Sequence, residues 1–301
     1  MNIFPILSEF CRKNPFFAIG IGFFFVLLSL LMLAGPFSLF IAYLNDTDIQ
    51  VLNQVAEGTM TDPSIIRFVL IVEGWTQVLT WGLVGLVMMY LVEDKMENIS
   101  PKQLPILPIA ILMMLAAIPL AQFVAFDAES FRLPSFLSEL EKSIEDKEAS
   151  TNGLIKALLS DKSAGTLVLN ILVLALVPGV CEEIFFRNFI QKRLSAKYSP
   201  FVAILLSSII FSAAHFQFFG FFSRMILGAV LGYVFYVSNS IVPSLLAHLS
   251  YNATMLFGVY AADARGMDLE KEVHIPIWGV LISISGLYFL GKMAFRTSQK
   301  E

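Results

Sequence analysis

Side chains that could together hydrolyse a bond in an apolar environment gather in the C-terminal half of the chain. They are Glu182, Glu183, Arg187, His215, His248 and Asn252. The two glutamates follow residues 163–181, a stretch without any Asp, Glu, Lys or Arg. A charge within a bilayer-length apolar run costs about 2.5–3.5 kcal/mol per residue on insertion scales. Ionisable residues that face the interior of a membrane bundle are therefore candidates for function.

Helical spacing sorts these side chains by role. Glu183 and Arg187 are four residues apart in the order that favours an ion pair on one helix face. Adjacent residues of an α-helix project about 100° apart, so Glu182 points elsewhere when Glu183 is paired. His248 and Asn252 are also four residues apart and share a face.

A carboxylate, two imidazoles and an amide in a dry cavity suggest a hydrolytic site. Glu182 could take a proton from water while a histidine holds that water or shuttles the proton. Asn252 could donate to a developing oxyanion. Alternatively, Glu182, His215 and His248 could bind a zinc ion that lowers the pKa of its water toward about 7. The sequence contains no H-E-x-x-H segment, so the usual zincin spacing does not apply.

Structural roles compete with these functional ones. A histidine such as His248 can act as packing glue between membrane helices, contributing about 0.6–2 kcal/mol per hydrogen bond. Cys181 is interpreted as apolar filler, because a buried thiol stays protonated. Glu73 could line the cavity, lie near the outer interface or pair locally. We expect Arg224 to be an interfacial anchor and His274 to face water.

The composition predicts an all-α, polytopic membrane helix bundle. Hydrophobic residues make up 57% of the chain and charged residues only 15%, against about 25% charged in soluble domains. A net charge of −4 provides no basic surface for nucleic acid. Two cysteines are too few for a disulfide framework.

Long apolar runs predict about eight transmembrane helices, each needing about 20 residues. Five runs contain no Asp, Glu, Lys or Arg: residues 14–45, 74–92, 103–126, 163–181 and 273–291. Residues 198–223 add a sixth span that carries His215. Residues 225–262 are long enough for two spans, with a polar break at 236–244.

Basic residues flank alternate spans, which predicts that both termini are cytoplasmic. We expect an integral protein of a bacterial inner membrane. The long loop at 128–162 is mostly acidic, and its segment SFLSELEKSIEDKEA (135–149) is typical of an amphipathic surface helix.

Three motifs resemble those of a known family. EEIFFR (182–187), FSAAH (211–215) and HLSYN (248–252) occur in the order of the family pattern EExxxR, FxxxH and HxxxN. The chain thereby resembles the CPBP intramembrane proteases, which include type II CAAX prenyl endopeptidases and bacterial relatives. The resemblance covers roughly residues 165–258.

The resemblance implies a bundle with its active site inside the membrane and hydrolysis of a peptide bond in a membrane-associated protein or peptide. By position, Glu182 and His215 would activate water. His248 would assist it or bind a metal, and Asn252 would help to form an oxyanion hole. Family members have been described as metalloproteases and as metal-free glutamate proteases, so both mechanisms stay open here.

The resemblance also assigns supporting roles and divides the chain. Glu183 and Arg187 would support the site. Residues 163–260 would form the catalytic core, residues 1–162 the N-terminal transmembrane helices with the acidic loop, and residues 261–301 the last transmembrane helix with a basic tail.

Two other functions fit the same polar cluster. A non-catalytic membrane scaffold, or a binding protein of the bacteriocin-immunity type, could use it to hold a partner. A transporter ranks lower, because the sequence has no visible internal repeat. Eukaryotic relatives remove three residues after a prenylated cysteine, and many bacterial relatives are linked to immunity or peptide maturation, so the substrate stays open.

Overall fold

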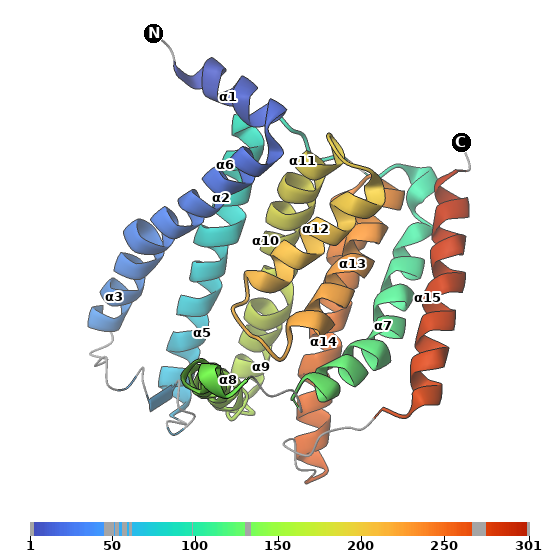
Figure 1. The fold of residues 1–301 in the computed structure, drawn as a ribbon. Coiled ribbons are helices and arrows are strands. Elements are labelled where there is room, and N and C mark those ends of the chain that lie inside the picture. Colours follow the sequence, from blue (N-terminus) through green and yellow to red (C-terminus); the bar gives the residue numbers. More distant parts are fainter. Residues whose placement is uncertain are drawn as a thin grey trace.

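The chain folds into a bundle of helices, confirming the predicted all-α membrane architecture (Figure 1). The computed structural model describes residues 3–44, 51, 54–55, 59, 62–97, 99–129, 134–266 and 275–299, and every regular element within them is helical. Six described helices are long and apolar enough to cross a membrane: Pro15–Leu44, Pro63–Leu91, Ile106–Ala125, Ala164–Ser195, Phe221–Ser238 and Ile277–Ser298.

The N-terminal helices form one side of the bundle (Figure 1). A short helix precedes two long ones, each of which contains a π-helical segment. The elements are α1 (Ile3–Lys13), α2 (Pro15–Ser29), a π segment (Leu30–Ala34), α3 (Gly35–Leu44), α5 (Pro63–Gln77), a π segment (Val78–Gly82) and α6 (Leu83–Leu91).

The remaining helices supply the centre and the other side of the bundle. They are α7 (Ile106–Glu129), α8 (Ser138–Leu158), α9 (Ala164–Asn170), α10 (Val177–Glu182), α11 (Lys192–Ser195), α12 (Pro200–Ala213), α13 (Phe221–Ser238), α14 (Ile241–Ala264) and α15 (Ile277–Ser298). Short 3₁₀ turns precede α7 and α8, at Pro101–Gln103 and Ser135–Leu137. Helix α7 packs on α13, α14 and α15.

Helices α9, α10 and α11 are one continuous rod with two π-helical segments, Ile171–Leu176 and Glu183–Gln191. Pro178 in the first turn of α10 has no N–H to donate, which accounts for the wide turns of the first segment. The second segment carries Glu183 and Arg187. Wide turns of this kind are rare and frequently lie at functional sites.

Close approach of α6 to this rod sets the direction in which the rod's side chains point. A Cβ at Gly85 would lie 2.9 Å from Ile184 Cγ2 and 3.3 Å from Phe185 Cα, so only glycine fits there. Phe185 packs against Phe23 and Trp81, with ring centroids 5.5 and 5.1 Å apart. The aromatic face of the rod therefore looks toward α2 and α6.

The predicted break within residues 225–262 is confirmed. Helix α13 ends at Ser238, and Asn239 takes a left-handed conformation with φ 47°, which asparagine tolerates better than most residues. The side chain of Ser240 then accepts a hydrogen bond from the N–H of Val242 and caps α14.

Several predicted boundaries differ from the structure. The span expected at 198–223 ends at Ala213, so α12 is only a 14-residue apolar helix. Together with α14, which is not among the six candidate spans, this leaves the predicted number of eight unconfirmed. The span expected at 74–92 begins at Pro63, because Asp62 caps that helix through the N–H of Ser64.

The acidic loop contains the expected surface helix, which runs further than predicted, from Ser138 to Leu158. The last span, predicted at 273–291, is α15 at Ile277–Ser298, and His274 lies outside the described residues. Helix α1 and the end of α15 lie at the same end of the bundle (Figure 1).

Candidate active site

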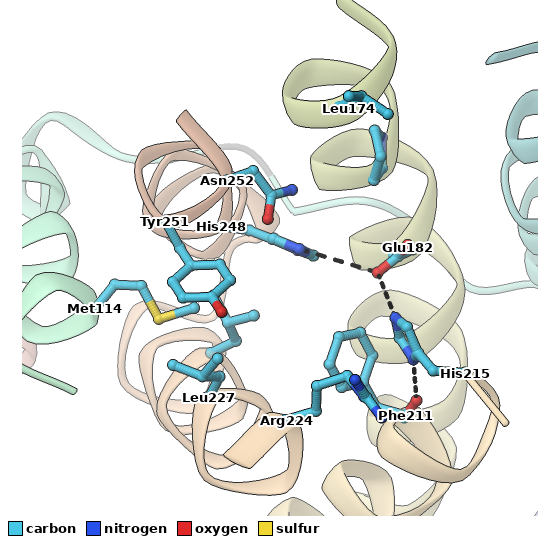
Figure 2. A pocket seen from close by; sticks show the side chains of 12 residues that line it. Met114, Leu174, Glu182, Phe211, His215, Arg224, Leu227, His248, Tyr251 and Asn252 are labelled. Carbon is cyan, nitrogen blue, oxygen red and sulfur yellow. Dashed lines mark hydrogen bonds and ion pairs between the residues drawn. The ribbon is translucent and has the colours of Figure 1, made fainter. Parts of the chain in front are cut away.

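A cavity of about 180 Å³ lies between α10, α13, α14 and the turn after α12. Four predicted site residues line it: Glu182, His215, His248 and Asn252 (Figure 2). Glu182 ends α10, whereas His248 and Asn252 lie one turn apart on α14. Segments more than sixty residues apart in the chain thus meet at one point.

His215 does not lie within a helix, contrary to expectation. Helix α12 ends at Ala213, and His215 occupies the turn that follows it. Its Nδ1 nevertheless lies 2.8 Å from the carbonyl oxygen of Phe211, which is the last-turn contact that the four-residue spacing allows. Phe216, the next residue, has a positive φ of 52°, so the backbone turns sharply after the histidine.

Two histidine nitrogens converge on one carboxylate oxygen. His215 Nε2 lies 4.0 Å and His248 Nε2 lies 3.9 Å from Oε2 of Glu182 (Figure 2). These separations are too long for direct hydrogen bonds but short enough for one water to contact both groups.

The opposite ring nitrogens determine the tautomers of both histidines. Nδ1 of His215 faces the Phe211 carbonyl, and Nδ1 of His248 lies 3.0 Å from Oε1 of Glu183. Because both partners only accept hydrogen bonds, we assign the proton of each neutral ring to Nδ1. Both Nε2 atoms then present lone pairs to the cavity.

Glu183 and Arg187 form a buried ion pair behind the cavity. Nε of Arg187 lies 3.2 Å from Oε2 of Glu183, and both side chains have no exposed surface. The guanidinium also lies over the ring of Phe211, 5.0 Å from its centroid. The same ring contacts His215 and His248 edge-on, with centroids 4.9 and 6.1 Å apart. Phe211 therefore contacts both the ion pair and the two histidines.

Asn252 is held against the rod. Its Nδ2 donates a long hydrogen bond of 3.4 Å to the carbonyl oxygen of Ala175, within the first π-helical segment of that rod. The amide lies next to His248 on the rim of the same cavity (Figure 2). A second N–H of the amide is thus available to an acceptor in the cavity.

The site residues have the types of zinc ligands, but their spacing does not suit the ion. Ligands of one tetrahedral zinc at about 2.0–2.2 Å lie roughly 3.3 Å apart, whereas each histidine nitrogen is 3.9 or 4.0 Å from the glutamate oxygen. Within the part of the chain that the structure describes, no three His, Cys, Asp or Glu side chains are placed to hold a metal ion.

Sequence reasoning missed two polar residues of the cavity, Arg224 and Tyr251. Arg224, expected as an interfacial anchor, lines it together with Tyr251 (Figure 2). The signal for Arg224 was present, since it is a charge at the start of an apolar helix. Cys181 is buried and free, as expected, and Glu73 is not among the described residues that line the cavity.

One comparison with known proteins gives a match. Residues 164–254 match the family model described as type II CAAX prenyl endopeptidase Rce1-like. The matched segment runs from the start of α9 into α14 and contains all three motifs. No match was found among curated proteins or among solved structures.

Proposed function

We propose that the chain is a member of the CPBP family, as the match of residues 164–254 to the type II CAAX prenyl endopeptidase Rce1-like model supports, and that it hydrolyses a peptide bond with a water activated by Glu182 and His215. The family supports an integral membrane protein with protease activity on a membrane-associated protein or peptide. The observation that carries the finer mechanism is the convergence of two histidine Nε2 atoms on Oε2 of Glu182.

The water is held between two acceptors. It donates one proton to Oε2 of Glu182 and the other to Nε2 of His215, which are 4.0 Å apart. A water that donates both protons presents its lone pairs to the open side of the cavity, where the substrate carbonyl would lie. Attack on that carbonyl carbon transfers a proton to Glu182 and leaves a tetrahedral oxyanion.

Asn252 and His248 act after the water has attacked the carbonyl carbon. Asn252 donates its free amide N–H to the oxyanion. His248 Nε2, 3.9 Å from Glu182, takes up the proton and returns it to the leaving nitrogen as the C–N bond breaks. The products are a carboxylic acid and an amine. Glu183 stabilises the protonated ring of His248 through Nδ1.

The pair of Glu183 and Arg187 supports this chemistry without touching the substrate. Both side chains are fully buried, and Glu183 joins the ion pair to the Nδ1 of His248. The guanidinium neutralises a carboxylate that would otherwise repel Glu182. We derive no step through zinc, because the residue spacing does not fit the ion.

We further propose that both termini are cytoplasmic. Helix α1 and the end of α15 lie at one end of the bundle (Figure 1), and the last turns of these two helices carry Arg12, Lys13 and Arg296. Basic residues near span ends are retained on the cytoplasmic side. Reporter fusions at each terminus test this orientation.

The test of proteolysis compares membrane-protein C-terminal peptides, by mass spectrometry, between cells with the wild-type chain and cells with Glu182→Gln. Peptide ends found only with wild type are expected, and they name the substrates. Glu73→Gln is the matched control, since it changes a carboxyl in another span that does not line the cavity. Identical profiles at equal protein levels would contradict proteolysis and favour a binding protein.

A further inference from the structure

Arg224 is the one Lys or Arg among the twelve described residues that line the cavity (Figure 2). It lies in the first turn of α13, one turn before Leu227 and Gly228, and its side chain shares the cavity with Glu182 and His215. Arg224 takes part in none of the proposed steps of hydrolysis. A permanent cation in an apolar span is costly, so its presence in the cavity calls for an anionic partner.

The guanidinium of Arg224 is held in place by Gln217 and Gly220. Nη1 donates to the side-chain oxygen of Gln217 at 2.7 Å, and Nη2 donates to the carbonyl oxygen of the same residue at 2.6 Å. A Cβ at Gly220 would lie 2.2 Å from Nη1, so the group packs directly on that glycine. The turn that carries His215 is thus closed around Arg224.

Part of the donor capacity of Arg224 is unused. Its Nε is buried and donates to no acceptor in the described part of the chain. The hydrogen bonds to Gln217 go to two uncharged oxygens, so they do not neutralise the positive charge. Arg187 differs, because Glu183 neutralises it.

No described carboxylate forms an ion pair with Arg224. Glu148 of α8 is the acidic side chain that interacts with it electrostatically, but its Oε1 accepts a hydrogen bond from the N–H of Phe219, at 3.4 Å. Glu182 faces the two histidines instead. The charge of Arg224 is therefore available to a molecule that enters the cavity.

We propose that Arg224 binds a carboxylate of the substrate and so places the scissile bond over Glu182. The guanidinium fork matches a carboxylate in shape and charge, whereas the amide and histidine side chains of the cavity do not. A peptide supplies this group either as its C-terminal carboxylate or as an Asp or Glu side chain. This inference rests on the proposed proteolysis and adds a specificity-determining residue to it.

The test uses the purified full-length protein in lipid nanodiscs and a library of N-palmitoylated ten-residue peptides. Each peptide is made with a free C-terminal carboxylate and with a C-terminal carboxamide, and each acidic residue is also replaced by its amide. The favoured carboxylate should raise kcat/KM about ten- to a hundredfold, as expected for hydrogen bonds to a charged group. The effect should lie in KM, because Arg224 does not touch the reacting atoms.

The two arms of the library distinguish the sources of the carboxylate. Loss of preference only on C-terminal amidation identifies the C-terminal group, and loss only on replacement of Asp or Glu identifies a side chain. In Arg224→Gln the preference should fall to about one, and cleavage of the neutral peptides that still depends on Glu182 shows that the variant is folded. Arg224→Lys should keep part of the preference.

A second variant moves Arg224 without removing it. Gly220→Ala places a methyl group against the guanidinium and should lower the preference for the carboxylate. Gly258→Ala is the control, since a Cβ there would meet no atom within 4 Å. Cleavage by the wild type that ignores both kinds of carboxylate overturns the inference and leaves proteolysis standing. No cleavage of any peptide, with unchanged peptide ends in cells, overturns the proposed function itself.

Discussion

Glu182 and Glu183 are neighbours in the chain but lie in opposite environments. Glu182 keeps 7% of its side-chain surface exposed and faces two histidines in the cavity. Glu183 has none exposed and is bound by Arg187 and by Nδ1 of His248. One carboxylate is thus available to water, and the other is neutralised within the protein.

The two glutamates illustrate two roles of a buried charge, one in the proposed chemistry and one in the stability of the fold. Removing a charge from the cavity side should abolish chemistry and leave the fold, whereas removing one from the ion pair should damage the fold. Phe211 lies against both sides, because its ring contacts Arg187 as well as the two histidines. The following variants test this separation, from the largest expected effect to the smallest.

Glu182→Gln should lower kcat/KM for cleavage by about 10³- to 10⁴-fold, because the amide cannot accept the proton of water. Its thermal unfolding midpoint should stay close to that of the wild type, since Glu182 forms no ion pair with Arg187. Peptide cleavage and thermal unfolding in nanodiscs measure the two quantities. Retained cleavage would contradict the role assigned to Glu182. A large drop in the unfolding midpoint would show that Glu182, like Glu183, is needed for the fold.

Arg187→Met should lower the free energy of unfolding by about 3–5 kcal/mol, because it leaves the buried carboxylate of Glu183 unpaired. Adding Glu183→Gln in the double variant should restore most of that loss, since no uncompensated charge then remains. Reversible unfolding in mixed detergent measures the wild type, the single variant and the double variant. A single variant as stable as wild type would show that the pair is not a structural requirement.

Gly85→Ala should lower the free energy of unfolding by about 1–3 kcal/mol through overpacking. The added methyl would press on the backbone of Phe185, with 3.2 Å to its nitrogen, and backbone cannot move aside as a side chain can. Gly20→Ala, where a Cβ meets no atom within 4 Å, is the control and should be neutral. Equal stabilities would indicate that the contact between α6 and the rod is loose.

Asp161→Asn should have the smallest effect, and only at neutral pH. The hydroxyl of Thr166, followed by the N–H of Ser163, holds the pKa of Asp161 below its usual range. Its stabilising contribution is therefore present above the unfolded pKa of about 3.9 and is lost as the pH falls through the lower folded value. The difference between wild type and variant should vanish on acidification below about pH 4. A stability difference that instead grows on acidification would contradict the lowered pKa of Asp161.

Residue types and spacing were sufficient to predict much of the local structure. The apolar runs predicted the membrane helices, and the four-residue spacing predicted the pairing of Glu183 with Arg187. The three motifs predicted a resemblance that the match of residues 164–254 to the type II CAAX prenyl endopeptidase Rce1-like model supports. These features depend on short stretches of chain, where helical periodicity alone decides which side chains meet.

The lengths of the elements near the site were less predictable. Helix α12 ends before His215, although the apolar run continues past it. Hydropathy records that a segment avoids water, but a turn packed inside the protein avoids water equally well. The wide turns after Pro178 likewise depend on packing that a periodic pattern does not contain.

The sequence by itself determined the membrane class of the protein, its match over residues 164–254 to the type II CAAX prenyl endopeptidase Rce1-like model, and the pairing of Glu183 with Arg187. Only the tertiary structure decided that Glu182 faces both histidines, that His248 is bound by Glu183, and that Arg224 enters the cavity rather than the membrane interface. The physical reason is that these contacts join helices far apart in the chain. Their relative rotation is determined by the packing of many side chains at once, which no local spacing encodes.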